Sequence, residues 1–202
     1  MSAPDLASAR LDDWLAALAA PVPEPGGGAA AGVVIATGAA LVAMTAGYAV
    51  APHRDAVLAD ATRARRDALV AAEHDGRMSA ALVAAFRRPA GDAERPAAII
   101  ATTVAAAEAS AALVDVAASL GSALTWLEEH GEPRVAPDVA VAARMLACGI
   151  RATAVNIRCD TTSARDAGAE VETLAPLHAA LAEALAVAQR FDALADRVTA
   201  TL

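Results

Sequence analysis

Apolar residues recur along nearly the whole chain at spacings of three and four, which is the period of an amphipathic helix. This pattern predicts six helical segments, at about 5–20, 26–50, 52–87, 96–129, 137–158 and 169–199. Alternation with a period of two occurs only in short stretches inside these segments, so we expect no sheet. The predicted fold class is all-α, an up-and-down bundle of about six long helices forming one domain over residues 1–202.

Prolines, glycines and polar clusters indicate where these segments end. Pro52 begins the third segment, and we expect Gly76 to bend or interrupt it. Gly121 is a candidate point of division in the fourth segment. The polar stretch Asp160–Ala167 predicts a break between the fifth and sixth segments.

The entry to the second segment is the most informative local pattern. Pro21, Pro23 and Pro25 cannot lie in a helix interior, and Gly26–Gly28 follow them without a side chain. The chain then carries no charge until Arg54. This pattern fits a tight turn before a core helix. It also fits a site for a flat or anionic ligand, because free N–H groups and a partial positive charge lie at a helix N-terminus.

Composition changes this picture in two ways. Hydrophobic residues make up 57% of the chain but aromatic residues only 2%, because alanine supplies the excess. We therefore expect helices that approach closely and a core made of many small contacts. The net charge is −8, without a basic run, which argues against a nucleic-acid partner. All sixteen basic residues are arginine, which excludes a Schiff base on a lysine.

The predicted location is the cytoplasm. Cys148 and Cys159 show no metal-binding or redox spacing, so we expect reduced thiols. The first ten residues contain no apolar run of a signal peptide. Gly26–Ala51 is long enough to span a membrane, but its apolarity comes mostly from alanine and glycine, and its flanks lack aromatic or basic anchors. We therefore expect no membrane partner.

Several polar residues are candidates for chemistry, each with a structural alternative. Asp75 is a poor residue for a helix interior, although it fits an exposed surface as well. Asp138 fits a helix first turn, where a carboxylate complements the dipole. Asn156 and Asp160 share one helix face and could bind a ligand or a neighbouring helix. His53 at a helix start is either solvated or a proton carrier.

Other signatures are absent from the sequence. The four histidines are too far apart in the chain to show a metal-binding spacing, so no metal site is predicted. No nucleophile elbow, P-loop or dinucleotide-binding glycine motif occurs.

Four motifs, in this order, carry a family resemblance. They are Trp14-Leu-Ala-Ala-Leu with Pro23-Glu-Pro-Gly-Gly-Gly-Ala-Ala-Ala and Ala40-Leu-Val-Ala-Met-Thr; Asp75 with Leu82-Val-Ala-Ala-Phe-Arg-Arg-Pro; Glu132-Pro-Arg-Val-Ala-Pro-Asp; and Ala154-Val-Asn-Ile-Arg-Cys-Asp. Together they resemble the cyclodeaminase domain of the formiminotransferase–cyclodeaminase family, which includes stand-alone methenyltetrahydrofolate cyclohydrolases. The resemblance spans roughly residues 11–166.

The resemblance implies an all-helical homodimer that binds a tetrahydrofolate derivative as substrate and needs no cofactor. It implies hydrolysis of 5,10-methenyltetrahydrofolate, or the related cyclodeamination of formiminotetrahydrofolate. Asp75 and Asp138 are then the expected carboxylate and base, with His53 as proton donor. The expected substrate-binding residues are Pro25, Gly26, Gly27, Gly28, Asn156 and Asp160.

The chain departs from the family pattern at three places. Gly47–Pro52 replaces a segment in which family members usually carry lysine, Pro137 replaces a serine, and Asp160 replaces an asparagine. These departures leave two alternatives open. One is an enzyme repurposed for another cyclic amidine-like substrate, and the other is a non-catalytic helical binding or assembly module.

Overall fold

The computed structural model describes Leu6 and residues 8–202, and within them the regular structure is helical. The helices are α1 (Leu11–Leu18), α2 (Gly27–Tyr48), α3 (Arg54–Phe86), α4 (Arg95–Ala118), α5 (Gly121–His130), a 3-10 turn η1 (Pro133–Val135), α6 (Ala136–Asp166) and α7 (Val171–Thr199). The prediction of an all-α fold is confirmed.

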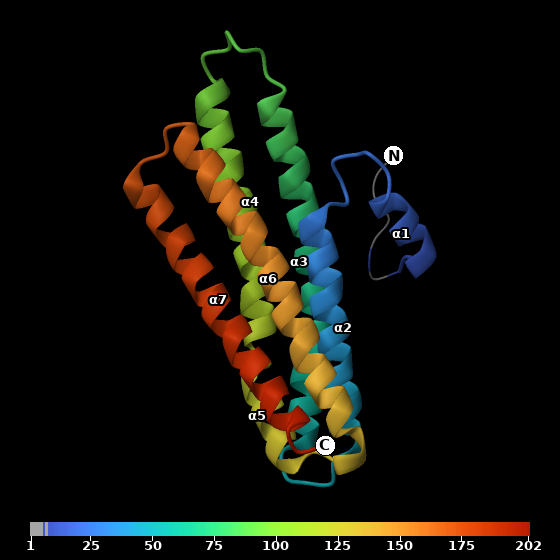
Figure 1. Ribbon diagram of the computed structural model, residues 1–202. Helices are drawn as coiled ribbons and strands as arrows, with labels where there is room; N and C mark the ends of the chain where they lie inside the picture. Colours follow the sequence, from blue (N-terminus) through green and yellow to red (C-terminus); the bar gives the residue numbers. More distant parts are fainter. Residues whose placement is uncertain (1–5, 7) are drawn as a thin grey trace.

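Five long helices form the bundle, and successive ones run in opposite directions (Figure 1). Helix α6 lies against α2, α4 and α7, while α3 packs on α2 and α4. Helix α5 continues α4 after a short turn, and α1 lies apart, beside the start of α2 (Figure 1). The α3–α4 hairpin extends beyond the first turn of α2, so that the first turn of α2 faces the sides of its neighbours rather than their ends (Figure 1).

Two predicted interruptions are wrong. Helix α3 continues through Gly76, which is buried against the side chain of Glu24. Helix α6 continues through the predicted break to Asp166, and its residues Asp160, Thr161 and Ala164 are buried against the bundle. The chain turns two residues later, at Gly168, where φ is +92° and a side chain would be strained.

Other boundaries lie close to the expected ones. The division near Gly121 is confirmed, since α4 ends at Ala118 and α5 begins at Gly121. Helix α1 begins only at Leu11, and the predicted start near residue 5 lies outside the described residues.

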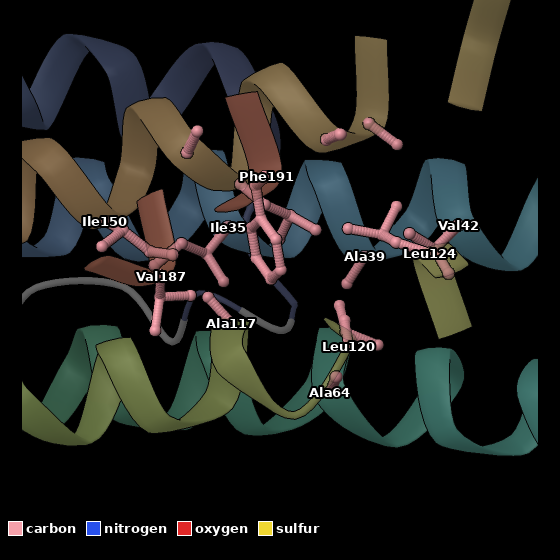
Figure 2. Packing of buried hydrophobic residues seen from close by; sticks show 14 of the residues in the cluster. Ile35, Ala39, Val42, Ala64, Ala117, Leu120, Leu124, Ile150, Val187 and Phe191 are labelled. Atoms are coloured by element: carbon pink, nitrogen blue, oxygen red, sulfur yellow. The ribbon is translucent and has the colours of Figure 1, made fainter. Parts of the chain in front are cut away.

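Small side chains dominate the core. Figure 2 shows the Phe191 ring of α7 near Ile35 and Ala117, with Leu120 and Leu124 further along the bundle. Most other members of this buried cluster are alanine, leucine or valine. The core therefore gains its stability from many short contacts between closely spaced backbones rather than from large rings.

Glycines set the distance between α2 and its neighbours. A Cβ on Gly32 would lie 2.5 Å from the Cβ of Ala72 on α3. On the other side, a Cβ on Gly149 of α6 would lie 2.5 Å from Cγ1 of Ile35 on α2. Both distances are shorter than any real contact, so these helix pairs can approach this closely only with hydrogen in place of a methyl group.

Four stretches of the described chain are long and apolar enough to cross a membrane, judged by length and composition alone: Gly27–Tyr48, Arg95–His130, Pro133–Asp166 and Val171–Thr199. In the bundle, their buried sides face one another. Ion pairs lie on the outside of the α6–α7 pair, where Arg144 and Arg151 of α6 both reach Asp192 of α7.

Replacing Gly32 with alanine tests the close approach of α2 and α3. The added methyl group would overlap Ala72, so we expect a loss of about 1–3 kcal/mol in the free energy of unfolding. Gly47→Ala is the matched control on the same helix, because nothing lies within 4 Å of its Cβ position. That variant should unfold at the same denaturant concentration as the wild type or a higher one, because alanine is the better helix former. Equal stability of the two variants would contradict this account.

Candidate functional site

The proline–glycine turn places the first turn of α2 against two other helices. Gly26 is the extended residue before the helix, and the first backbone bond runs from the Ala30 N–H to the Gly26 carbonyl at 3.1 Å. The N–H groups of Gly27, Gly28 and Ala29 therefore have no partner within α2. The expectation of a helix N-terminus with free amides is confirmed, and the partial positive charge there favours carboxylates.

Asp75 lies directly beneath this turn. Its side chain is only 3% exposed, and Oδ1 accepts a hydrogen bond of 2.7 Å from the Ser110 hydroxyl of α4. Its Oδ2 lies 1.9 Å from the position that a Cβ on Gly28 would take. The carboxylate therefore occupies the space that a side chain at position 28 would need, and three helices hold it in place.

Helix α6 contributes the second polar face of the site. Asn156 Oδ1 lies 3.8 Å from the Cβ position of Gly27. One helical turn further on, Asp160 is 9% exposed and lies near enough to Asp75 for their charges to interact. Gly27 is exposed, whereas Gly28 is buried. The site thus has an open side at Gly27 and Asn156 and a buried floor with two carboxyl groups.

The two carboxyl groups differ in the hydrogen bonds and charges around them. Burial raises the pKa of Asp75, while the Ser110 hydrogen bond and the nearby His74 oppose this rise. Burial and the charge of Asp75 raise the pKa of Asp160 to about 7. Within the described residues no hydrogen bond or ion pair supports the Asp160 carboxylate. Of the two, Asp75 therefore has the better-supported charged form.

Ser110 is a site residue that the sequence reasoning did not identify. Buried threonines elsewhere donate to carbonyls of their own helix, as Thr103 does to Ile99 at 2.7 Å and Thr153 to Gly149 at 2.9 Å. Ser110 instead donates across the bundle to Asp75. In an alanine-rich helix a serine gives almost no sequence signal, so only the helix packing reveals this role.

The proline turn before α2 packs against α3 next to Asp75. Pro25 is buried, and the Glu24 side chain lies 3.3 Å from the Cβ position of Gly76. Before the turn, the Leu6 N–H donates to Oε1 of Glu73 at 2.7 Å. Pro25 and Gly26 thus fix the entry to α2, while Gly27 and Gly28 make the contacts with the polar groups.

Within one chain, Asp138 and His53 lie apart from this group, and their roles as base and proton donor stay predictions. Asp138 lies in the first turn of α6, about 30 Å along the helix from Asp160 at a rise of about 1.5 Å per residue. His53 precedes α3, about 30 Å along that helix from Asp75. Residues from motifs that follow one another along the chain can lie far apart, because each long helix places its two ends about 30 Å or more from each other.

Each of these two residues has a local structural role. Asp138 is half-buried and complements the α6 dipole. His53 adopts a left-handed conformation with φ of +69°, which ends the connection from α2, and it lines a cavity of about 630 Å³ formed by residues 47–56.

Other features lie away from the site. Cys148 and Cys159 are free, exposed thiols. Among the residues that the structure describes, no group of three or more histidine, cysteine or acidic side chains is arranged to hold a metal ion. A cavity of about 810 Å³ between α5 and α7 is lined by other residues, Trp126 and Arg197 among them.

Gly28→Ala tests whether Asp75 depends on the missing side chain. The new methyl group would displace the buried carboxylate, so we expect a loss of about 1–3 kcal/mol in stability. Gly27→Ala is the matched control, since its Cβ would make an ordinary 3.8 Å contact with Asn156. Thermal unfolding of both variants measures the difference. If Gly28→Ala is as stable as Gly27→Ala, then Asp75 is not held against α2.

Comparisons with known proteins bear on the family and the fold of this chain. The family model for formiminotransferase-cyclodeaminase matches residues 10–179. A crystal structure of formiminotetrahydrofolate cyclodeaminase from Thermotoga maritima is similar in fold, with a TM-score of 0.73 and 20% identity over 96% of this chain and 98% of that chain. No curated protein matches the sequence. Because the family model covers most of the chain, including Gly27, Asp75 and Asp160, this protein belongs to the formiminotransferase-cyclodeaminase family.

Proposed function

We propose that this chain is a folate enzyme that hydrolyses 5,10-methenyltetrahydrofolate to 10-formyltetrahydrofolate. The observation that carries the proposal is the buried Asp75 carboxylate, bonded to Ser110 beneath the first turn of α2, in a chain of this family. The substrate is a cation at the carbon that bridges its two nitrogens. A buried carboxylate attracts such a cation and can accept a proton from the attacking water.

The remaining groups fit the shape of this substrate. Gly27 and the Asn156 side chain lie on the open side, and with the other amides of Gly26–Gly28 they can position the flat pteridine ring and its polar edge. Asp160 lies behind them, near Asp75. In this proposal the chain uses side chains and backbone amides alone, without a cofactor, and the tetrahydrofolate derivative enters as the substrate.

Cyclodeamination of formiminotetrahydrofolate is the second candidate reaction. The name of the Thermotoga maritima protein, whose fold this chain shares, favours it. Both reactions pass through a tetrahedral carbon between the same two nitrogens. They differ in whether oxygen enters or ammonia leaves, and the same carboxyl groups serve either case.

Loss of the methenyltetrahydrofolate absorbance, followed at slightly acidic pH where spontaneous hydrolysis is slow, tests the first reaction. We expect the wild type to accelerate it and Asp75→Asn to reduce kcat about 100-fold or more, as for loss of a general base. Asp67→Asn is the matched control, because Asp67 is an exposed carboxylate on the same helix. Ammonia release from formiminotetrahydrofolate, measured on the same three proteins, tests the second reaction.

Full activity of Asp75→Asn would contradict the role given to Asp75. A wild type without either activity, whose melting temperature also does not rise with tetrahydrofolate, would contradict the folate proposal, since a ligand of the native state must stabilise it. The result would then favour a repurposed enzyme or a non-catalytic module.

We further propose a soluble, cytoplasmic homodimer that pairs through the outer face of α2 and α6. Helix α2 carries no charged residue from Gly27 to Tyr48, on its exposed side as well as its buried side. Beside it, a largely apolar cavity of about 670 Å³ is lined by residues that include Val34, Val141 and Met145. A second copy of the same face would cover these side chains.

Val141→Arg tests this interface by placing a charge at its centre. We expect the wild type to sediment as a dimer at micromolar concentration and Val141→Arg as a monomer. Val70→Arg is the control, because Val70 is also an exposed valine but lies on α3, away from this face. A monomeric wild type, or a dimer in all three proteins, would contradict the proposed interface.

A further inference from the structure

Asp160 is a buried acid of the site to which no described residue donates a hydrogen bond. It is nine-tenths buried, yet no donor among the described residues supports its carboxylate, and it lies beside the negative charge of Asp75. An ionised carboxylate in this position would receive no hydrogen bond from a described residue, would lose most of its water and would repel its neighbour. With its proton, the same side chain is neutral and becomes a hydrogen-bond donor.

We propose that Asp75 and Asp160 share one proton, with Asp160 as the neutral acid and Asp75 as the carboxylate, and that Asp160 donates this proton to the leaving nitrogen of the substrate. The proposal rests on the proposed function and deepens it. It also supplies a proton donor at the site, because His53 of the same chain lies about 30 Å along α3 from Asp75.

The hydrogen bonds decide which member of the pair is ionised. Ser110 donates to Asp75, which stabilises a carboxylate there, and His74 adds a favourable charge when protonated. Asp160 receives neither kind of support. Accordingly, burial and Asp75 together raise the pKa of Asp160 to about 7, while the rise at Asp75 is opposed by both neighbours.

The helices around the pair add few other charges. Helix α2 contributes backbone amides and no charged side chain, and α4 contributes Ser110, with Glu108 exposed nearby in sequence. On α3, His74 is exposed. Where α6 meets α7, Arg158, Arg165 and His178 line a separate small cavity with Thr161, and within the described residues none of them forms an ion pair with Asp160.

With this pair, the proton transfers of one hydrolysis reaction balance. Water adds to the bridging carbon, a C–O bond forms, and Asp75 accepts the water proton. The C–N5 bond then breaks, its electron pair goes to N5, and Asp160 donates its proton to N5. The remaining hydroxyl proton returns to Asp160 as the C=O bond forms, and Asp75 releases its proton to solvent. Each turnover consumes one water, releases one proton and restores the pair.

Asp160→Asn tests the shared proton without any substrate, because asparagine has the shape of the neutral acid. Both pKa values are raised in the folded state, so the native protein binds more protons than the unfolded chain between about pH 4 and 7. The stability of the wild type should therefore fall as pH rises through this range. We expect the melting temperature of Asp160→Asn, relative to wild type, to increase by at least about 2 °C between pH 5 and pH 8.

Asp67→Asn is the control, since an exposed carboxylate should give a pH-independent difference. Infrared spectroscopy provides a second readout, in which wild type at pH 6 should show the C=O band of a buried carboxylic acid that Asp160→Asn lacks. If the melting-temperature difference does not change with pH and the infrared band is absent, then the two aspartates do not share a proton. This conclusion holds whether or not the enzyme acts on folates.

The catalytic half of the proposal is tested by pH profiles. Wild-type kcat should fall as pH rises above about 7, because Asp160 loses its proton there. Asp160→Asn should have a kcat about 100-fold lower, a similar KM and no such fall. A variant with wild-type kcat would overturn proton donation by Asp160 while leaving the folate activity standing. A shared proton in a wild type without folate activity would instead overturn the proposed function and the donation with it.

Discussion

Burial of the Asp75 carboxylate under the first turn of α2 is the constraint on which the site depends. The carboxylate fills the space beside Gly28, so α2 can begin at this point only if no side chain stands there. Ser110 fixes one oxygen from α4, and Asp160 faces it from α6. Four helices thus meet at one buried charge, and their relative positions determine the geometry of the polar groups.

The bundle makes this burial possible through close packing. Alanine and glycine let α2 lie near both α3 and α6, and the same approach that forms the core brings the first turn of α2 onto Asp75. Two carboxyl groups in such a place oppose folding, because their charged forms lose water and repel each other. Retaining them at the cost of stability is typical of positions used for chemistry.

Family membership and the residues of this chain carry different information. The family model and the related crystal structure indicate the fold, with low identity to the latter. Asp160 and the absence of lysine are read from the sequence of this chain itself. In the proposed mechanism, an aspartate at position 160 supplies a proton that an asparagine of the same shape could not supply.

The sequence by itself determined the helical class and the start of α2, because helical periodicity and proline–glycine turns act locally. It also named Gly27, Gly28, Asp75 and Asn156 as candidates, and these residues lie together in the structure. It did not determine the extension of α6 through Asp160, since buried polar residues look like a loop until their neighbours are known. Only the tertiary structure separated Asp138 and His53 from the site and brought Ser110 into it. Distances between helices depend on packing in three dimensions, which the order of motifs along the chain does not contain.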